Sequence, residues 1–263
     1  SLVGGIASSG NPGSYNEISN CLMILDQANS NGIDIVGPNY ADYYIRNNII
    51  LYTGSIYNNP GYGIDIGAPR TVHIYNNLIS GFTNNIFTDT PDSVFIKNNL
   101  LINQYSNSSG PASINTGGGR TFTNNLILAR NKKAIWGDYR VTTDYNIFWL
   151  NQTNLDGIIF GDSDIVADPM FVNDTIPAAN SNYDFHLQAF SPGIDKGDPN
   201  DLDLDGTRSD IGLYGGPFGE TYTYQDLAPL APRNLSAVVD TNNITVKWNH
   251  NTEADTAYYK VYR

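Results

Sequence analysis

Residues 94–101 read Val-Phe-Ile-Lys-Asn-Asn-Leu-Leu, and this stretch decides the fold: alternating side chains, an asparagine doublet, then two aliphatic residues. The doublet with its aliphatic pair recurs along the chain, at 47–50, 76–79, 98–101 and 124–127, with variants at 19–22 and 145–148. The intervals of 21 to 29 residues are typical of a protein built from stacked structural repeats.

Each doublet is preceded by short alternating segments, which indicate β-strands. One segment directly precedes the doublet, at 43–46, 72–75, 94–97 and 121–123. A second lies 11 to 15 residues earlier in the chain, at 33–35, 64–66, 86–87, 113–115 and 134–136. Turn-forming Gly, Asn, Asp and Pro separate these segments and leave no room for helices. The chain is therefore predicted to be all-β, a right-handed parallel β-helix with three strands per coil.

The asparagine doublet has a physical reason to recur at equivalent corners. Asparagine tolerates the left-handed backbone conformation that a tight corner needs. Stacked asparagine side chains can also hydrogen-bond from one coil to the next as a ladder. We therefore expect an asparagine ladder at one turn, with the aliphatic residues after each corner pointing into the core.

The asparagine-cornered coils resemble the pectate-lyase-like β-helix superfamily, over roughly residues 15 to 220. That superfamily includes lyases, glycoside hydrolases, esterases, adhesins and phage tailspikes, so the resemblance implies a fold and not one activity. On this basis residues 1–166 are predicted to form the β-helix coils.

The repeat pattern changes at Ala167. Residues 167–226 contain Asp168-Pro169-Met170-Phe171, Asp184-Phe185-His186-Leu187 and 191–198, Ser-Pro-Gly-Ile-Asp-Lys-Gly-Asp. They resemble the closing section of secreted bacterial β-helix proteins. Because the last coil of a solenoid would otherwise expose its core and its strand edges, we expect this section to cover that end.

A Pro-containing linker at 227–232 leads to a third region, residues 227–263 in all. Segments 233–238, 243–248 and 258–263 alternate as strands and resemble the first three strands of a fibronectin type III β-sandwich, with Trp248 as its core tryptophan. Such a sandwich needs more residues than are present. The sequence is therefore expected to be a piece of a longer, secreted or cell-surface bacterial protein.

Composition narrows the class of partner. Only 15% of the 263 residues are charged, and the formal net charge is −12. A nucleic-acid-binding protein needs a basic surface, so we expect no nucleic-acid partner. Because no apolar stretch approaches about 20 residues, no membrane span is expected.

Candidate ligand-binding residues lie on the first strand of each coil. If Ile33 and Ile35 point inward, Asp34 points outward, and Asp65 does likewise in the next repeat. The following outward positions are Phe87, then Ser113 or Asn115, then Trp136. Carboxylates can form an acid–base pair, and aromatic faces stack on sugar rings. A solvated face with two unrelated aspartates is the alternative.

Basic residues gather around Trp136. Lys132 and Lys133 precede it and Arg140 follows it. In polysaccharide lyases of this fold a Lys or Arg takes the proton beside a uronate, so Lys133 and Arg140 are candidate catalytic groups, together with Asp34 and Asp65. Lys132 is a candidate carbohydrate contact. No lyase signature matches residue by residue, and a solvated basic turn remains the alternative.

A possible calcium site lies in the closing section. Asp201, Asp203 and Asp205 have the spacing of the first half of a calcium loop, and Asp210 could complete the ligand set. The position of the bidentate glutamate holds Gly212, so the segment is not an EF-hand. The alternative is a network of these acids with Arg208 that seals the end of the solenoid.

Together these observations lead to two hypotheses. In the first, a secreted or cell-surface β-helix protein binds a polysaccharide or cell-surface glycan and cleaves it as a lyase or glycoside hydrolase, with cleavage left open. In the second, the solenoid is a non-catalytic adhesin, sheath or filament component that self-associates.

Overall fold

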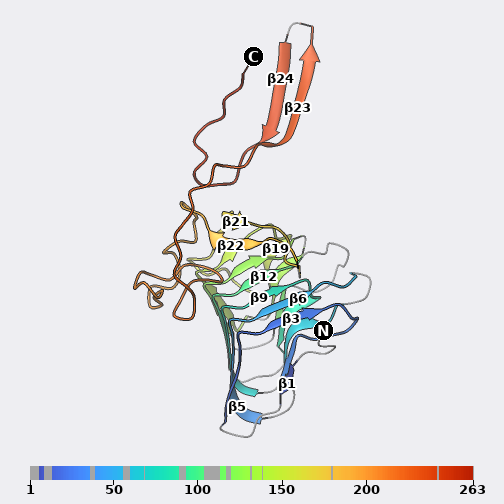
Figure 1. The fold of residues 1–263 in the computed structure, drawn as a ribbon, viewed down its shortest axis with the longest axis vertical. Coiled ribbons are helices and arrows are strands. Elements are labelled where there is room, and N and C mark those ends of the chain that lie inside the picture. Colours follow the sequence, from blue (N-terminus) through green and yellow to red (C-terminus); the bar gives the residue numbers. More distant parts are fainter. Residues whose placement is uncertain are drawn as a thin grey trace.

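The computed structural model describes residues 6–8, 14–35, 39–55, 60–67, 69–88, 93–103, 113–116, 120–130, 132–137, 139–178, 180–241 and 243–262. In these ranges every regular element is a β-strand (Figure 1). Across the same ranges, no helix is long and apolar enough to cross a membrane.

Three parallel sheets, here called A, B and C, make up the larger part of the molecule. Neighbouring strands within a sheet are three apart in chain order, except β18 and β20 of sheet C, which are two apart. Sheet A comprises β1 (Ile6–Ser8), β4 (Ile33–Ile35), β7 (Tyr62–Ile66), β10 (Asn84–Thr88), β13 (Ile114–Thr116), β16 (Lys133–Trp136) and β19 (Thr153–Asp156). Sheet B comprises β2 (Tyr15–Ser19), β5 (Asn39–Arg46), β8 (Pro69–Tyr75), β11 (Ser93–Lys97), β14 (Arg120–Thr123) and β17 (Val141–Asp144). Sheet C comprises β3 (Leu22–Leu25), β6 (Ile49–Tyr52), β9 (Leu78–Ser80), β12 (Leu100–Ile102), β15 (Leu126–Leu128), β18 (Ile147–Phe148) and β20 (Ile165–Val166).

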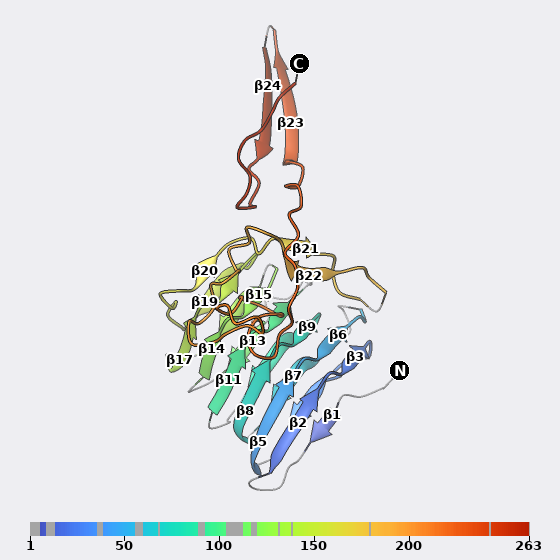
Figure 2. The ribbon, with the colours of Figure 1, turned by 60° about the vertical axis from the view of Figure 1, so that its left-hand side comes forward.

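The stacked arrangement of these strands is a parallel β-solenoid, as the repeat predicts. Figure 2 shows the strands of sheet B side by side, from β2 to β17. The pairing keeps equivalent repeat positions opposite one another: Ile45 pairs with Ile74, and Ile74 pairs with Ile96. Equivalent residues of successive repeats therefore form columns that run along the solenoid.

The two residues of each asparagine doublet have different structural roles. The first takes the left-handed conformation, with φ between 52° and 59° at Asn47, Asn76, Asn98 and Asn124. Asn20, second in the 19–22 variant, takes the same conformation (φ 56°), because Ser19 pairs with Arg46 and Asn20 therefore lies at the corner opposite Asn47. These are the corners between sheets B and C. Asparagine is the non-glycine residue that this region of backbone space favours, so its recurrence at the corner follows from the turn.

The second asparagine builds the expected ladder. The Nδ2 of Asn77 donates to Oδ1 of Asn99 (3.0 Å), and the Nδ2 of Asn99 donates to Oδ1 of Asn125 (3.0 Å). Asn48 begins this run and Asn146 continues it to the Oδ1 of Asp164 (2.8 Å). Each amide also donates to a backbone carbonyl of the preceding repeat, as Asn99 does to Ile74 (2.8 Å). The ladder asparagines are buried and fully engaged in hydrogen bonds along the stack.

The aliphatic residues after each corner do not all point into the solenoid, which corrects the expectation from the sequence. Leu101 and Ile127 belong to the main core between the three sheets. Leu100 and Leu126 belong to a second core on the outer side of sheet C. Because the inner strands of sheet C, β9 to β18, are buried on both faces, they read as continuous apolar runs rather than as an alternation.

The second core is covered by the closing section. Its strands β21 (Phe171–Asn173) and β22 (Asp184–Leu187) pair antiparallel, and Phe185, Leu187 and Ile211 pack on sheet C. This section therefore lies along the side of the solenoid rather than only over its last coil. At that end, Leu155 and Ile158 pack against the main core.

The closing section also binds the corner asparagines. The Nδ2 of Asn76 donates to the carbonyl of Gly215 (2.7 Å), and the Nδ2 of Asn98 donates to that of Asp210 (3.0 Å). At Asn124, the Oδ1 accepts the backbone N–H of Asp198 (2.6 Å). The outward asparagine of each doublet is thus both the turn residue and the attachment point for residues 198–218.

A two-stranded antiparallel hairpin follows the linker, β23 (Arg233–Asp240) and β24 (Asn243–Asn249), and extends away from the solenoid (Figure 1). The third strand predicted at 258–263 is wrong for residues 258–262, which form no strand, and Arg263 lies outside the described residues. Trp248 does contact Tyr259, with ring centroids 5.3 Å apart. A strand needs a hydrogen-bonding partner, and residues 258–262 pair with neither hairpin strand.

Candidate functional site

The outward residues predicted on sheet A do form one column. Asp34 is paired with Asp65, and Asp65 with Phe87. The column then runs through Asn115 and Trp136 to Asp156, each opposite the one before. Alternation fixed this register, because Ile33, Ile64, Ile86, Ile114 and Ile135 form the matching inward column. Neighbouring positions are about 4.8 Å apart along the solenoid.

The acidic end of the column holds Asp34 and Asp65 as direct cross-strand neighbours. Both are partly buried. The Asn31 side chain donates its Nδ2 to Oδ2 of Asp65 (3.1 Å) and accepts the backbone N–H of Tyr62 (2.9 Å) on its Oδ1. Like charges directly opposite one another on a sheet are destabilising, so this pair costs the fold stability.

The two aromatic residues of the column differ in what they offer to a ligand. The Phe87 ring stacks on Tyr62, with centroids 4.7 Å apart and planes inclined by 10°, so one of its faces is covered. Trp136 is 46% exposed. A ligand that stacks on a ring therefore has more surface available at Trp136 than at Phe87.

An ion pair lies beside Trp136. The Lys133 Nζ is 2.5 Å from Oδ2 of Asp156, and both side chains are partly exposed. Asp156, opposite Trp136 in the column, was not among the residues predicted from the sequence. The alternation of Leu155 and Asp156 at the next repeat would have identified it. The pair places an acid and a base next to the exposed tryptophan.

The structure separates the other two basic candidates from this column. Lys132 is 5% exposed, and burial lowers the pKa of its ammonium group, so it does not present its charge on the outer face. Arg140 lies in the turn before β17, a strand of sheet B, and its guanidinium is 5.9 Å from the ring centroid of Tyr139. Of the basic residues predicted around Trp136, Lys133 is thus the one that the structure pairs with a described acid of the column, Asp156.

A longer aromatic column, missed from the sequence, lies on the outer face of sheet B. The rings of Tyr15, Tyr44, His73 and Phe95 stack in succession, with centroid separations of 4.8, 4.4 and 5.1 Å. The last two contacts have planes inclined by 10°. Burial lowers the pKa of the His73 imidazole. Because each ring covers the face of the next, the column mainly presents ring edges to a ligand. The alternation of outward residues at Tyr44, His73 and Phe95 is the signal that could have found it.

The predicted calcium ligands make separate contacts. Asp201 pairs with Lys97 (2.9 Å between Oδ2 and Nζ). Asp205 accepts the backbone N–H and the hydroxyl of Thr207, in the same exposed turn. Each of these carboxylates is thus held by a partner of its own.

The other two aspartates of this segment, Asp210, which is buried, and Asp203, which is partly buried, are structural acceptors. Asp203 accepts the backbone N–H of Asp210 (3.0 Å) and that of Gly216, and burial raises its pKa to about 6. Asp210 accepts the hydroxyls of Tyr222 (3.2 Å) and Tyr224 (3.0 Å), and burial raises its pKa too. In the described part of the chain, no three His, Cys, Asp or Glu side chains are arranged to hold a metal ion.

The alternative prediction, a network of these aspartates with Arg208, differs from the contacts that Arg208 makes in the structure. The Arg208 Nε donates to the carbonyl of Gly197 (2.6 Å), and the guanidinium lies 5.4 Å from the ring centroid of Tyr145. The segment does attach to the solenoid, but through backbone groups, asparagine side chains and the pair between Lys97 and Asp201.

Fold and site together define a parallel β-solenoid whose sheet A carries an outward column of acidic, amide and aromatic side chains. Comparison with protein-family models, with curated proteins and with solved structures found no match.

Proposed function

We propose that the outer face of sheet A binds a glycan, with Trp136 as the stacking platform and its neighbours as hydrogen-bonding groups. The proposal includes a right-handed coil with three strands, the pectate-lyase-like ancestry that the asparagine corners resemble, and a secreted or cell-surface location. In it, residues 227–263 belong to a fibronectin type III-like module.

The observation that carries the proposal is the exposed Trp136 ring in register between Asn115 and Asp156. Sugar rings present an apolar face and hydroxyl groups at their edges. An aromatic face with amide and carboxylate groups on both sides matches both features. An extended polymer laid along the column would also meet Phe87 and then the two aspartates.

Cleavage is a second part of the proposal, and the ion pair beside Trp136 favours it. Glycoside hydrolases need two carboxyl groups, and lyases need a base at the sugar ring. Asp34 with Asp65, and Asp156 with Lys133, are the groups that could supply these roles. Calcium at the acidic end of the column or in the closing section remains a proposal for the same experiment.

A screen of the chain against neutral and acidic oligosaccharides, with calcium and with a chelator, tests binding. Assays for reducing ends and for the ultraviolet absorbance of unsaturated products then test cleavage. Trp136→Ala should weaken binding about tenfold, since an aromatic stacking contact contributes about 0.5–1.5 kcal/mol beyond the apolar area that it buries. Tyr139→Ala is the matched control, because Tyr139 is 86% exposed and outside the column, and it should bind as the parent does.

One observation favours the alternative, a structural or adhesive surface protein. The stacked rings of sheet B and the Tyr62–Phe87 pair use aromatic faces for contacts within the solenoid. If the screen shows no binding, and Trp136→Ala changes only self-association measured by light scattering, the structural function replaces the glycan-binding one.

A further inference from the structure

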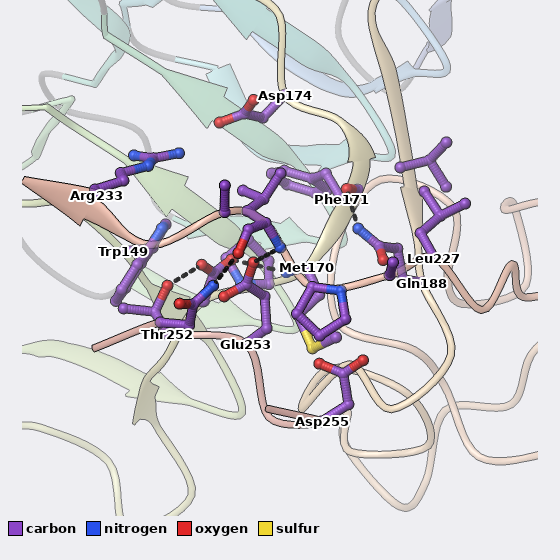
Figure 3. Close-up of a pocket in the computed structure, with 18 of the residues that line it drawn as sticks. Trp149, Met170, Phe171, Asp174, Gln188, Leu227, Arg233, Thr252, Glu253 and Asp255 are labelled. Atoms are coloured by element: carbon purple, nitrogen blue, oxygen red, sulfur yellow. Dashed lines mark hydrogen bonds between the residues drawn. The ribbon is translucent and has the colours of Figure 1, made fainter. Parts of the chain in front are cut away.

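A cleft of about 520 Å³ lies where the closing section meets the linker and the loop after β24 (Figure 3). We call it the junction cleft. Its walls come from three parts of the chain: the end of sheet C, the segment around β21, and residues 227–234 with 249–255. It shares no residue with the sheet A column. Clefts of this volume at module junctions are common sites for small ligands.

Two contacts hold the loop after β24 against the closing section and so form the cleft. The Thr252 hydroxyl donates to Oδ2 of Asp168 (2.5 Å), and the backbone N–H of Ala254 donates to the Met170 sulfur (3.4 Å). Asp168 also accepts the backbone N–H of Met170 (3.0 Å) on its other oxygen. The floor of the cleft is therefore ordered by its own hydrogen bonds.

One part of the lining is apolar and includes an aromatic ring. Trp149, Met170 and Leu227 line the cleft together (Figure 3). The Trp149 side chain is partly exposed, so its indole is available to a ligand. An indole can pack on the apolar face of a sugar ring, and it attracts a nearby cation.

The charged lining is mainly acidic, and one carboxylate oxygen lacks a partner. Glu253 accepts the backbone N–H of Leu230 (2.8 Å), whereas the Oδ1 of Asp255 is shielded from solvent and accepts no hydrogen bond in the structure. Arg233 lies on the other side of the cleft from Asp255 (Figure 3). A buried acceptor without a donor is costly, and the negative charge of the Asp255 carboxylate attracts a cationic group that enters the cleft.

Side-chain amides supply the remaining polar groups. Asn234 and Asn249 line the cleft, and both residues are exposed. An amide both donates and accepts, as does a sugar hydroxyl, whereas a lysine or arginine side chain only donates. The amides therefore favour a hydroxylated ligand over a basic peptide side chain.

We propose that the junction cleft binds an amino sugar, with its ring on Trp149, its hydroxyls at Asn234 and Asn249, and its ammonium group directed to Asp255. The site is separate from the sheet A column and does not depend on the function proposed for it.

Calorimetric titration of the whole chain with short oligomers of glucosamine, N-acetylglucosamine and glucose tests the proposal. Glucosamine oligomers should bind about tenfold or more tightly than the other two, because they alone bring the charge-assisted donor. The isosteric variant Asp255→Asn should abolish this preference, and Trp149→Phe should weaken binding of all three. Tyr139→Ala, at a side chain that is 86% exposed and lies outside both the cleft and the sheet A column, should leave the glucosamine affinity unchanged.

Equal affinity for the three oligomers, or an unchanged preference in Asp255→Asn with native far-ultraviolet circular dichroism, would overturn the proposal. Tri-lysine that binds as tightly as the glucosamine oligomer would overturn the sugar assignment. Loss of glucosamine binding in Trp136→Ala but not in Trp149→Phe would assign the ligand to sheet A, which rejects the cleft while supporting the function proposed for that face.

Discussion

At the scale of single residues, the asparagine doublet combines two properties of one side chain. The first asparagine takes a left-handed corner and reaches outward to the closing section, as Asn98 does toward Asp210. The second turns inward and joins the ladder, as Asn99 does with Asn125. Tyr145 takes the same left-handed conformation, with φ 58°, at the corner where the doublet pattern is broken. There the ladder still continues through Asn146.

Asn99→Ala should destabilise the fold by about 3 kcal/mol or more, because its Oδ1 accepts two N–H groups of Asn77 and its Nδ2 donates to Asn125. Buried groups that lose their partners each cost about 1–3 kcal/mol. Urea unfolding followed by circular dichroism measures the change. Asn115→Ala, on the outer face, is the control and should change stability by less than about 0.5 kcal/mol. Equal effects of the two substitutions would refute the structural role of the ladder.

Buried carboxyl groups in the closing section predict a specific pH dependence. Burial raises the pKa of Asp203 to about 6, from an ordinary value of 3.8. Between these values the folded chain retains a proton that the unfolded chain has lost. The contribution of Asp203 to stability is therefore present at pH 4 and decreases as the pH rises through 6. Asp210, whose pKa is also raised, acts in the same direction.

The slope of the unfolding free energy against pH, measured from pH 4 to 6.5, checks this dependence. In Asp203→Asn the slope should be less negative than in the parent, whatever the absolute loss of stability caused by the amide. An unchanged slope would show that Asp203 titrates as an exposed carboxyl group does.

At the scale of strands and sheets, the sequence predicts faces well where one side of a sheet is solvated. The alternation Ile33-Asp34-Ile35 defined the inward and outward columns of sheet A correctly. It could not do so in sheet C, because Leu100 and Leu101 are both buried, in different cores. The cover over Leu100 comes from Phe185 and Leu187, far along the chain, and no local pattern indicates that packing.

Contacts between segments that are distant in the sequence also explain why some predictions for the site and for the third hairpin strand were wrong. Lys132 lies beside Lys133 in sequence, yet one is buried and the other pairs with Asp156. Residues 258–262 have strand-like alternation but no strand partner. A sequence repeat identifies candidate functional residues, whereas the exposure of their side chains depends on contacts between distant segments.

The two-sided burial of sheet C can be tested with neighbouring leucines. Leu101→Ala removes a side chain from the main core, and Leu100→Ala removes one from the core under the closing section; both are fully buried. Each should cost about 2–5 kcal/mol in denaturant unfolding. If Leu100→Ala were nearly neutral while Leu101→Ala was costly, the closing section would not cover sheet C as described.

At the scale of the whole molecule, the stacking of repeats determines which side chains are neighbours on each face of the solenoid. The column of sheet A, the rings of sheet B and the second core on sheet C each arise because equivalent residues of successive repeats are in register. The closing section binds several repeats at once through their corner asparagines, from Asn47 to Asn124. The proposed glycan face depends on this register more than on any single residue.

The most direct test of the register is disulfide formation between outward positions of sheet A. In a Cys21→Ser background, Asp34→Cys with Asp65→Cys places two thiols on adjacent paired strands, within the reach of a disulfide. Asp34→Cys with Phe87→Cys places them two strands apart, about 10 Å, beyond that reach. The account predicts that mild oxidation followed by mass spectrometry finds an intramolecular disulfide in the first pair only. Absence of the 34–65 disulfide, or an equal yield for 34–87, would contradict the stacked solenoid.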